Sequence, residues 1–196
     1  MKTPWIYRVG LSTDETSEVE LKNLGFKYEL VEIESALREH IDETLGKPYK
    51  FYTSMREDAP DFFSCSSLVS YLYVFAGIHM PSLSVDKYKF FKKIEKEDLK
   101  YGDLVFSHND KERESPDHLG MYLGDGKIIQ AAGYWYLGKV VIENLEESPS
   151  FKNRIGYCRV VDDIKEKRFV VEIPEDKPDL RNKVSLLQEI QIRNKI

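Results

Sequence analysis

Three residues of this chain have the types, and the order along the sequence, that a cysteine hydrolase requires. Cys65 stands where an apolar-striped helix is expected to begin, and His118 opens an alternating strand further along. Gln130 follows on the next predicted strand. A thiol nucleophile, an imidazole base and a polar group that orients the imidazole together perform nucleophilic catalysis. These residues are therefore the candidate catalytic set.

A tight turn between the two strands is expected to place the base and its orienting group together. Gly124-Asp125-Gly126 is a strong hairpin signal. A turn centred on Asp125 makes His118 and Gln130 diagonal neighbours on one face of the sheet. The opposite face is apolar and is expected to be the core face, with Leu119, Met121, Leu123, Ile129 and Ala131.

The thiol needs this environment because the thiolate is the nucleophile, and a free cysteine with a pKa of about 8.5 is mostly protonated at neutral pH. A helix N-terminus and a nearby imidazolium both favour the thiolate. The histidine then returns a proton to the leaving amine. The amide oxygen of Gln130 fixes the imidazole tautomer, but it brings no charge and stabilises imidazolium less than a carboxylate would.

Each of these residues also fits an ordinary structural position. Cys65 lies on an apolar stripe, which is typical of a core residue, and His118 fits a histidine with satisfied hydrogen bonds. His108, at the end of another predicted strand, is a rival base. A metal site built from His108, Asp110, Asp117 and His118 lacks tight ligand spacing, so we expect no metal ion and no cofactor.

The elements around these residues indicate an α+β fold. Residues 34–45 have helical spacing, and a second helix begins at Cys65 with Ser64 as its N-cap. Gly77 is expected to end that helix in a left-handed conformation. The predicted strands are residues 103–107, 118–123, 127–131, 140–142 and 155–161. Helices followed by antiparallel strands favour α+β over a parallel α/β arrangement.

Length, charge and cysteine content narrow the class of protein. A chain of 196 residues suffices for one well-cored domain with extensions. The net charge of −5 lacks the basic footprint of a nucleic-acid binder. No apolar run approaches the roughly 18 residues of a membrane span. Cys65 and Cys158 do not require a disulfide, and Cys158 is expected to be a buried small residue in a strand.

Four segments, in this order, carry a family resemblance. Phe63–Val69 looks like the pattern Phe-Asp-Cys-Ser-Gly/Ser-Leu/Phe-Val, and Leu99–Phe106 is similar to Leu-x-Pro-Gly-Asp-Leu-Val-Phe. His118–Gly126 resembles His-Val-Gly-Ile-Tyr-Leu-Gly-x-Gly, and Ile128–Ala131 occupies an Ile-His-Ala position. These are motifs of the NlpC-type family of cell-wall cysteine peptidases, and the resemblance covers roughly residues 36–161.

The resemblance implies a papain-like fold in which N-terminal helices pack on an antiparallel sheet of about five strands. It also implies hydrolysis of peptidoglycan stem peptides, usually between γ-D-glutamate and a diamino acid such as meso-diaminopimelate. Cys65 would be the nucleophile, His118 the base and Gln130 the third polar residue. Tyr49 and Ser66 would line the site, and the backbone N–H of Cys65 would bind the oxyanion.

The chain departs from the family pattern near the site, and two alternatives stay open. Ser64 stands where the family usually has Asp, and Gln130 where His is commoner; Ser82 and Lys87 replace an Arg and a Gln. A non-catalytic peptide-binding module is one alternative. The other is an acyltransferase or lipid hydrolase of the circularly permuted related group, although there His normally precedes Cys.

A longer loop than usual, residues 51–63, carries Glu57, Asp58 and Asp61. These acids are expected either to be solvated or to bind the free amine of a stem peptide.

The remaining segments are expected to flank the catalytic domain. We predict an N-terminal extension at residues 1–35, the NlpC-type domain at 36–161 and a charged C-terminal extension at 162–196. The last contains a possible strand, 169–173, and an amphipathic helix around 184–192. Residues 1–8 lack the apolar core and cleavage site of a secretory signal. We therefore expect a cytoplasmic enzyme acting on soluble wall-derived peptides, with export by another route left open.

Overall fold

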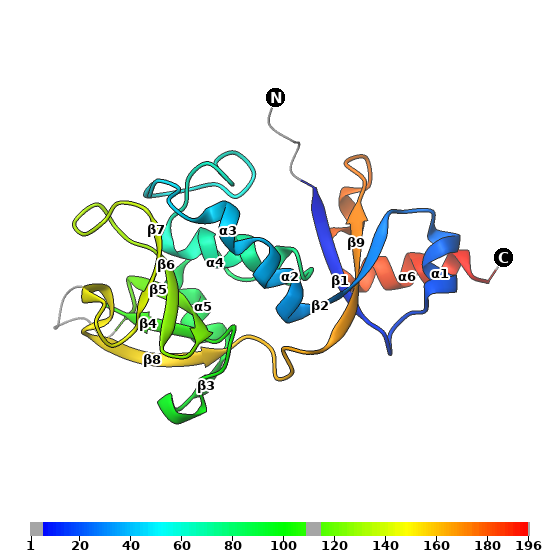
Figure 1. The fold of residues 1–196 in the computed structure, drawn as a ribbon. Helices are drawn as coiled ribbons and strands as arrows, with labels where there is room; N and C mark the ends of the chain where they lie inside the picture. The colour runs from blue at the N-terminus through cyan, green and yellow to red at the C-terminus, as the bar shows by residue number, and fades with distance from the viewer. Residues whose placement is uncertain (1–5, 109–114, 196) are drawn as a thin grey trace.

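Two antiparallel sheets, each with its own apolar core, lie next to each other in the computed structural model, which describes residues 6–108 and 115–195 (Figure 1). The larger sheet has six strands in the order β3-β8-β4-β5-β6-β7, and the smaller has three in the order β1-β9-β2. We call them the larger and the smaller unit, each with the helices packed on it. In Figure 1 the larger unit is on the left and the smaller one is on the right.

The larger unit contains the predicted fold with one more strand than the expected five or so. Its strands are β3 (Lys92–Ile94), β4 (Leu104–Ser107), β5 (His118–Gly124), β6 (Lys127–Ala131), β7 (Val140–Asn144) and β8 (Arg154–Arg159). Its helical segments are α2 (Ile33–Glu39), α3 (Ile41–Thr44), α4 (Cys65–Val74), α5 (Ser84–Phe90), η1 (Lys96–Asp98) and η2 (Pro149–Phe151). The additional strand is β3, which at three residues is too short for an alternating pattern to reveal it.

Helix α4 begins at the candidate nucleophile because the residues around its start satisfy its free backbone groups. The Ser64 hydroxyl accepts from the Ser67 N–H, and the Ser67 hydroxyl accepts from the Ser64 N–H, which forms a capping box. The predicted N-cap is therefore confirmed. Beyond the helix, Gly77 adopts a φ of 66°, the left-handed conformation predicted for it.

The β5–β6 hairpin has the predicted register. Met121 pairs with Ile129 and Tyr122 with Ile128, and Asp125 at the tip adopts a φ of 48°. The apolar face of the hairpin is buried in the main core as expected, with Leu119, Met121, Ile129 and Ala131 fully buried and Leu123 partly buried. Turn chemistry and alternation alone therefore fix which face His118 and Gln130 occupy.

The smaller unit joins the two flanks of the chain, which were expected as separate extensions. Strands β1 (Tyr7–Ser12) and β2 (Tyr28–Glu32) both pair with β9 (Lys167–Ile173), which lies between them. Helices α1 (Glu18–Leu24) and α6 (Lys183–Arg193) pack together on this sheet, and the short helix η3 (Pro178–Arg181) precedes α6. The exact domain boundaries stay a prediction.

The two units touch where β1 passes the end of α4. The Gly10 N–H donates to the Gly77 carbonyl at 3.0 Å. A Cβ atom on Gly77 would lie 2.2 Å from the Gly10 nitrogen, and one on Gly10 would lie 2.9 Å from the Ala76 oxygen. The close approach therefore requires glycine at both positions.

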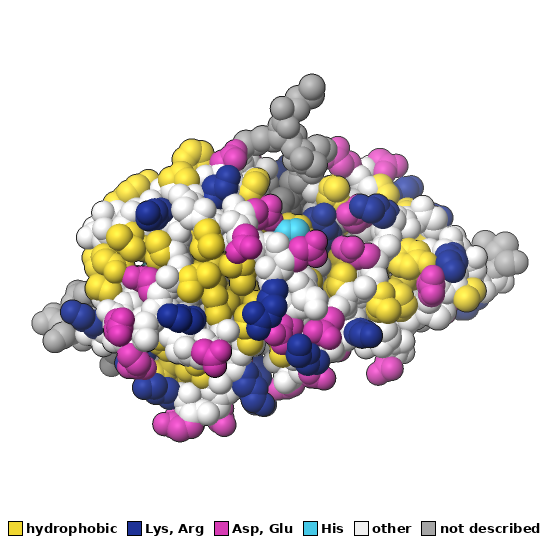
Figure 2. Space-filling model, viewed as in Figure 1, with side chains coloured by type: hydrophobic (Ala, Val, Ile, Leu, Met, Phe, Trp, Pro, Cys, Tyr) yellow, Lys and Arg dark blue, Asp and Glu magenta, His cyan; other side chains and the backbone are white. Residues whose placement is uncertain are grey.

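The surface in Figure 2 shows acidic and basic side chains mixed over both units, with apolar side chains gathered mainly over the larger one. Among the exposed large apolar residues are Phe51, Tyr52, Phe62, Tyr134, Trp135 and Leu137, which belong to loops of the larger unit. Within the described ranges, no helix combines the length and apolar character needed to cross a lipid bilayer.

Candidate active site

Cys65 and His118 meet where the first turn of α4 faces the start of β5. The Sγ atom of Cys65 lies 3.9 Å from the carbonyl oxygen of Asp117, the residue before His118, and the thiol and the imidazole shift each other's pKa. Cys65 is 8% exposed and His118 is 6% exposed. The structure thus brings the predicted nucleophile and base together in a site with little exposed surface.

The surroundings of this pair favour its charged form. Burial raises the pKa of the Cys65 thiol, but the hydrogen bond and charge of His118, with the Leu119 N–H and the Ser66 side chain, bring that pKa below its usual value. Burial lowers the pKa of His118, and its bonds to Cys65 and Gln130 outweigh that and raise it. Both directions support a thiolate–imidazolium pair.

Gln130 completes the chain of hydrogen bonds that was predicted from the hairpin. Its Oε1 lies 2.6 Å from His118 Nε2, and its side-chain nitrogen donates to the Glu143 carboxylate and, at 3.1 Å, to Ser148 Oγ. Those two acceptors require the amide nitrogen to face them, so the amide oxygen must face His118. The His118 Nε2–H therefore donates to Gln130, which leaves Nδ1 for Cys65.

Glu143 is the charged residue of this network, and neither it nor Ser148 was predicted from the sequence. Besides Gln130, it accepts a hydrogen bond of 2.6 Å from the Tyr136 hydroxyl. It lies opposite Ile128 in the β6–β7 pairing, which makes it a diagonal neighbour of Gln130 on the same face. The predicted strand ended at Ile142, one residue before Glu143 and two before the observed end at Asn144. Extending it by one residue would have placed a carboxylate behind Gln130.

Tyr49 and Ser66 both interact electrostatically with the Cys65 thiol. The ring of Tyr49 meets that of Tyr134 edge-on, with 5.1 Å between the ring centres. Burial, followed by the charge of Cys65, raises the pKa of Tyr49 to about 12, so its hydroxyl stays neutral. The Ser66 side chain lowers the pKa of the Cys65 thiol. Their roles in oxyanion or substrate binding stay predictions.

Lys87 places a buried amine near the same thiol. Its side chain is fully buried, and its Nζ donates to the carbonyls of Pro81 and Ser82. Burial lowers the pKa of Lys87 to about 8, and the charge of Cys65 opposes this shift. The amine is therefore largely protonated at neutral pH and favours the thiolate.

The other candidates from the sequence occupy structural positions. The backbone of His108 exchanges hydrogen bonds with Asn153 at the end of β4, and the thiol is paired with His118 instead. Cys158 is fully buried and free, as expected. Within the described residues, no group of three or more His, Cys, Asp or Glu side chains could hold a metal ion. Asp110 lies outside them.

Asp58 of the acidic loop stabilises the loop itself. The Asp58 carboxylate forms an ion pair of 2.6 Å with Lys50 and accepts from the Ser54 N–H at 2.8 Å. Asp58 therefore holds the loop together. The expected contact of Glu57 or Asp61 with a peptide amine stays a prediction.

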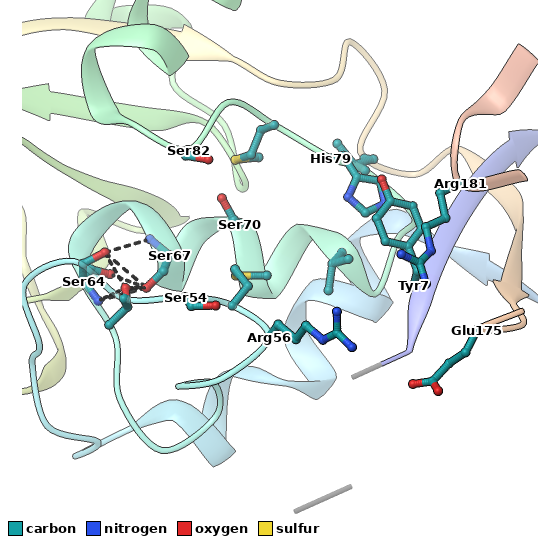
Figure 3. A pocket seen from close by; sticks show the side chains of 15 residues that line it. Tyr7, Ser54, Arg56, Ser64, Ser67, Ser70, His79, Ser82, Glu175 and Arg181 are labelled. Carbon is teal, nitrogen blue, oxygen red and sulfur yellow. Dashed lines mark hydrogen bonds between the residues drawn. The ribbon is translucent and has the colours of Figure 1, made fainter. Parts of the chain in front are cut away.

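A pocket of about 450 Å³ is lined at one end by Ser64, the residue that precedes the nucleophile (Figure 3). At one end, the hydroxyls of Thr53, Ser64 and Ser67 hydrogen-bond one another at 2.6 to 3.2 Å. At the other end, the smaller unit contributes Tyr7, Glu175 and Arg181. Figure 3 shows the serines gathered on one side of the pocket and the charged residues on the other. The pocket thus connects the start of α4 with the smaller unit.

Comparisons with known sequences relate this site to a family. The model of the NlpC/P60 family matches residues 46–159. The murein DD-endopeptidase MepH of Escherichia coli is 37% identical over 122 residues, which are 61% of this chain and 43% of that protein. The gamma-DL-glutamyl hydrolase of Bacillus subtilis is 31% identical over 124 residues, 61% of this chain and 28% of that protein. The chain spans less than half the length of these curated relatives.

Solved structures confirm the predicted α+β fold. NlpC2 from Trichomonas vaginalis is 25% identical, with a TM-score of 0.55 over 65% of this chain and 46% of its own. An NlpC/P60 family protein from Bacillus cereus is 27% identical, with a TM-score of 0.55 over 64% of this chain and 39% of its own. RipD from Mycobacterium tuberculosis, described as non-catalytic and adapted to peptidoglycan binding, shares the fold at 20% identity and a TM-score of 0.52, over 67% of this chain and 99% of its own.

Proposed function

Because this chain belongs to the NlpC/P60 family, we propose that it is a cysteine peptidase that hydrolyses peptidoglycan stem peptides. The observation that carries the proposal is the position of the Cys65 thiol at the start of β5, next to a His118 whose imidazole is oriented by a hydrogen bond to Gln130. Family membership alone would not suffice, since RipD has this fold and is described as non-catalytic. A peptide-binding module has no need of a thiol whose pKa is lowered by a paired histidine.

The chemistry follows from the geometry of the three side chains. The Cys65 thiolate attacks the carbonyl carbon of the scissile bond, and the backbone N–H groups at the start of α4 stabilise the developing oxyanion. His118 donates its proton to the leaving amine, which leaves a thioester on Cys65. Water then attacks the thioester with His118 as base, and the thiolate is regenerated. Gln130 holds the imidazole orientation throughout.

The scissile bond that we propose is the one between γ-D-glutamate and a diamino acid such as meso-diaminopimelate. The names of two relatives support it, a gamma-DL-glutamyl hydrolase and a bifunctional muramidase/DL-endopeptidase, both of Bacillus subtilis. MepH is instead a DD-endopeptidase. The relatives therefore differ in the bond that they cleave. The products of digestion by this protein identify its scissile bond.

The test is a digest of purified stem peptides followed by mass spectrometry. Wild-type protein is expected to release a fragment ending in γ-D-glutamate, and Cys65→Ala is expected to release none. Cys158→Ala is the matched control, because it removes the other buried thiol. Cleavage by Cys65→Ala, or no cleavage by any form together with no unusual reactivity of Cys65 toward iodoacetamide, would refute the proposal.

The non-catalytic alternative has one observation in its favour, the small exposure of Cys65. A pure binding module should retain stem peptides without cleaving them, and its Cys65 should react with iodoacetamide no faster than an ordinary thiol. Rapid alkylation below pH 8 would exclude that alternative, because it requires a thiolate population that an unperturbed cysteine lacks.

A further inference from the structure

The arginines in the described part of the chain divide into two groups. Most form an ion pair with a carboxylate, namely Arg8, Arg38, Arg154, Arg159, Arg168 and Arg193. Within the described part of the chain, Arg56 and Arg181 have no carboxylate at ion-pair distance. Both of them line the pocket that begins at Ser64. The described arginines without a carboxylate partner thus line the same pocket.

Arg181 is held in position by stacked rings. Its guanidinium lies 5.6 Å from the centre of the Tyr7 ring, and Tyr7 stacks on His79 at 4.3 Å with the planes 9° apart. Burial lowers the pKa of His79, so its ring is neutral at physiological pH. The Nε of Arg181 is buried without a hydrogen-bond partner in the described structure. A fixed guanidinium with unused donors is ready to bind an anion.

Arg56 brings a second positive charge from the other unit. It belongs to the loop that carries the three acids, yet the loop residues lining the pocket are Thr53, Ser54, Met55 and Arg56. Glu175 is the one acid among the described residues that line the pocket. The lining therefore carries two guanidinium groups against one carboxylate, in a chain whose net charge is −5. This local excess of positive charge is opposite in sign to the whole protein.

We propose that this pocket binds a carboxylate of the substrate peptide, with Arg56 and Arg181 as its ligands. The inference rests on the proposed function and specifies the substrate. Guanidinium groups bind carboxylates through paired, charge-assisted hydrogen bonds. A γ-linked D-glutamate keeps its α-carboxylate free, and an unmodified stem peptide also ends in a carboxylate. The hydroxyls of Ser64 and Ser67 at the other end of the pocket would contact the peptide near the scissile bond.

One consequence is that residues of both units bind the substrate. Arg56 lies in the larger unit, whereas Arg181 lies in η3 of the smaller unit. Substrate selection would then depend on residues outside the stretch that the family model matches, residues 46–159.

The experiment uses four versions of one stem peptide, with the D-glutamate α-carboxyl and the C-terminal carboxyl each either free or amidated. Wild-type protein is expected to show a higher KM when one of these carboxyls is amidated, by roughly tenfold to a hundredfold, the loss typical of a hydrogen bond to a charged group. Arg56→Gln and Arg181→Gln should each reduce that discrimination. Arg181→Lys should keep part of it, because the positive charge remains.

The control is Lys22→Gln, which removes one positive charge from an exposed ion pair on α1. It should preserve the wild-type preference. Two results would overturn the pocket assignment without contradicting the proposed hydrolysis. One is equal KM values for all four peptides with wild-type protein, and the other is wild-type discrimination in both arginine variants.

Binding to the Cys65→Ala variant separates this proposal from the proposed function. If no peptide is cleaved by wild-type protein but Cys65→Ala binds one carboxylate form more tightly than its amide, the pocket assignment survives and the peptidase proposal fails. Equal affinity for all four forms would overturn the pocket assignment without reference to catalysis.

Discussion

The polar groups behind His118 differ from those around the pocket in whether they have hydrogen-bond partners within the protein. Behind His118, Gln130 bonds to the imidazole on one side and to Glu143 and Ser148 on the other. In the pocket, the Nε of Arg181 is buried without a partner among the described residues, and Arg56 is an exposed guanidinium without an ion pair there. Satisfied buried networks fix one geometry, whereas unsatisfied charges at a cavity await a ligand.

The contrast distinguishes the catalytic residues from the residues that we propose select the substrate. A nucleophile and a base must be oriented before the substrate arrives, since reorganisation during the reaction would add to the barrier. A binding pocket gains affinity when the substrate supplies the missing partner. Changes behind His118 should therefore act on kcat, and changes in the pocket on KM.

His118→Ala should give the largest effect, on the chemistry side of this comparison. We expect hydrolysis to fall by about a hundredfold to ten-thousandfold, the usual contribution of a general acid–base group. The pKa of Cys65 should rise, because burial then acts without the opposing histidine. The rate of iodoacetamide alkylation measured against pH should show its midpoint moving upward. An unchanged midpoint would mean that His118 does not control the thiol.

The pH profile of the wild-type protein tests the same pair without mutation. Thiolate is lost when the pH falls below the lowered pKa of Cys65, and imidazolium is lost when the pH rises above the raised pKa of His118. Hydrolysis should therefore be bell-shaped, with a larger fraction of the ion pair near neutral pH than an unperturbed cysteine and histidine would give. A maximum confined to pH above 9 would contradict the ion pair.

Glu143→Gln should have the next largest effect. The carboxylate that fixes the Gln130 amide becomes an amide itself, so Gln130 can turn its nitrogen toward His118. We expect kcat to fall by roughly tenfold to a hundredfold, as for a small misplacement of a reacting group. KM should change less. Glu147→Gln, on an exposed neighbouring acid, is the control, and equal kcat values in both variants would remove Glu143 from the site.

Gly77→Ala should act mainly on the pocket, because it separates the two units. An alanine must adopt the left-handed conformation, at a cost of about 1–2 kcal/mol, and its Cβ would also collide with Gly10. Thermal unfolding should shift down by several degrees. The preference between free and amidated peptides should weaken more than Cys65 alkylation does. The reverse ranking would show that the junction supports the thiol rather than the pocket.

Lys87→Met should give the smallest effect. Loss of the buried ammonium should raise the pKa of Cys65 and slow alkylation at neutral pH by less than about tenfold. The pKa of Lys87 is about 8, so the difference from wild type should disappear above that pH. Lys89→Met, on the exposed side of the same helix, is the matched control. A difference that persists at pH 9 would indicate a packing effect.

The sequence predicted the local part of the site and missed the non-local part. The hairpin register follows from one Gly-Asp-Gly turn and from alternation, both of which act over a few residues. Glu143 was not predicted as a site residue because the predicted strand ended at Ile142. The pairing of β9 with β1 and β2 joins residues far apart in the chain, and no periodicity within either flank specifies its partner. For the same reason, no local pattern could place Arg181 near Arg56.

Strand β9 has a further mechanical consequence. It lies between β1 and β2, although it follows β8 in the sequence. The chain therefore leaves the three-stranded sheet after β2, forms the six-stranded sheet, and returns to the smaller sheet after β8. The two parts are hence tethered by a pair of short covalent crossings, at Glu32–Ile33 and at residues 160–166. A double tether resists twisting far better than a single linker. Any opening between them should resemble a hinge with one axis, and shortening either crossing should stiffen it.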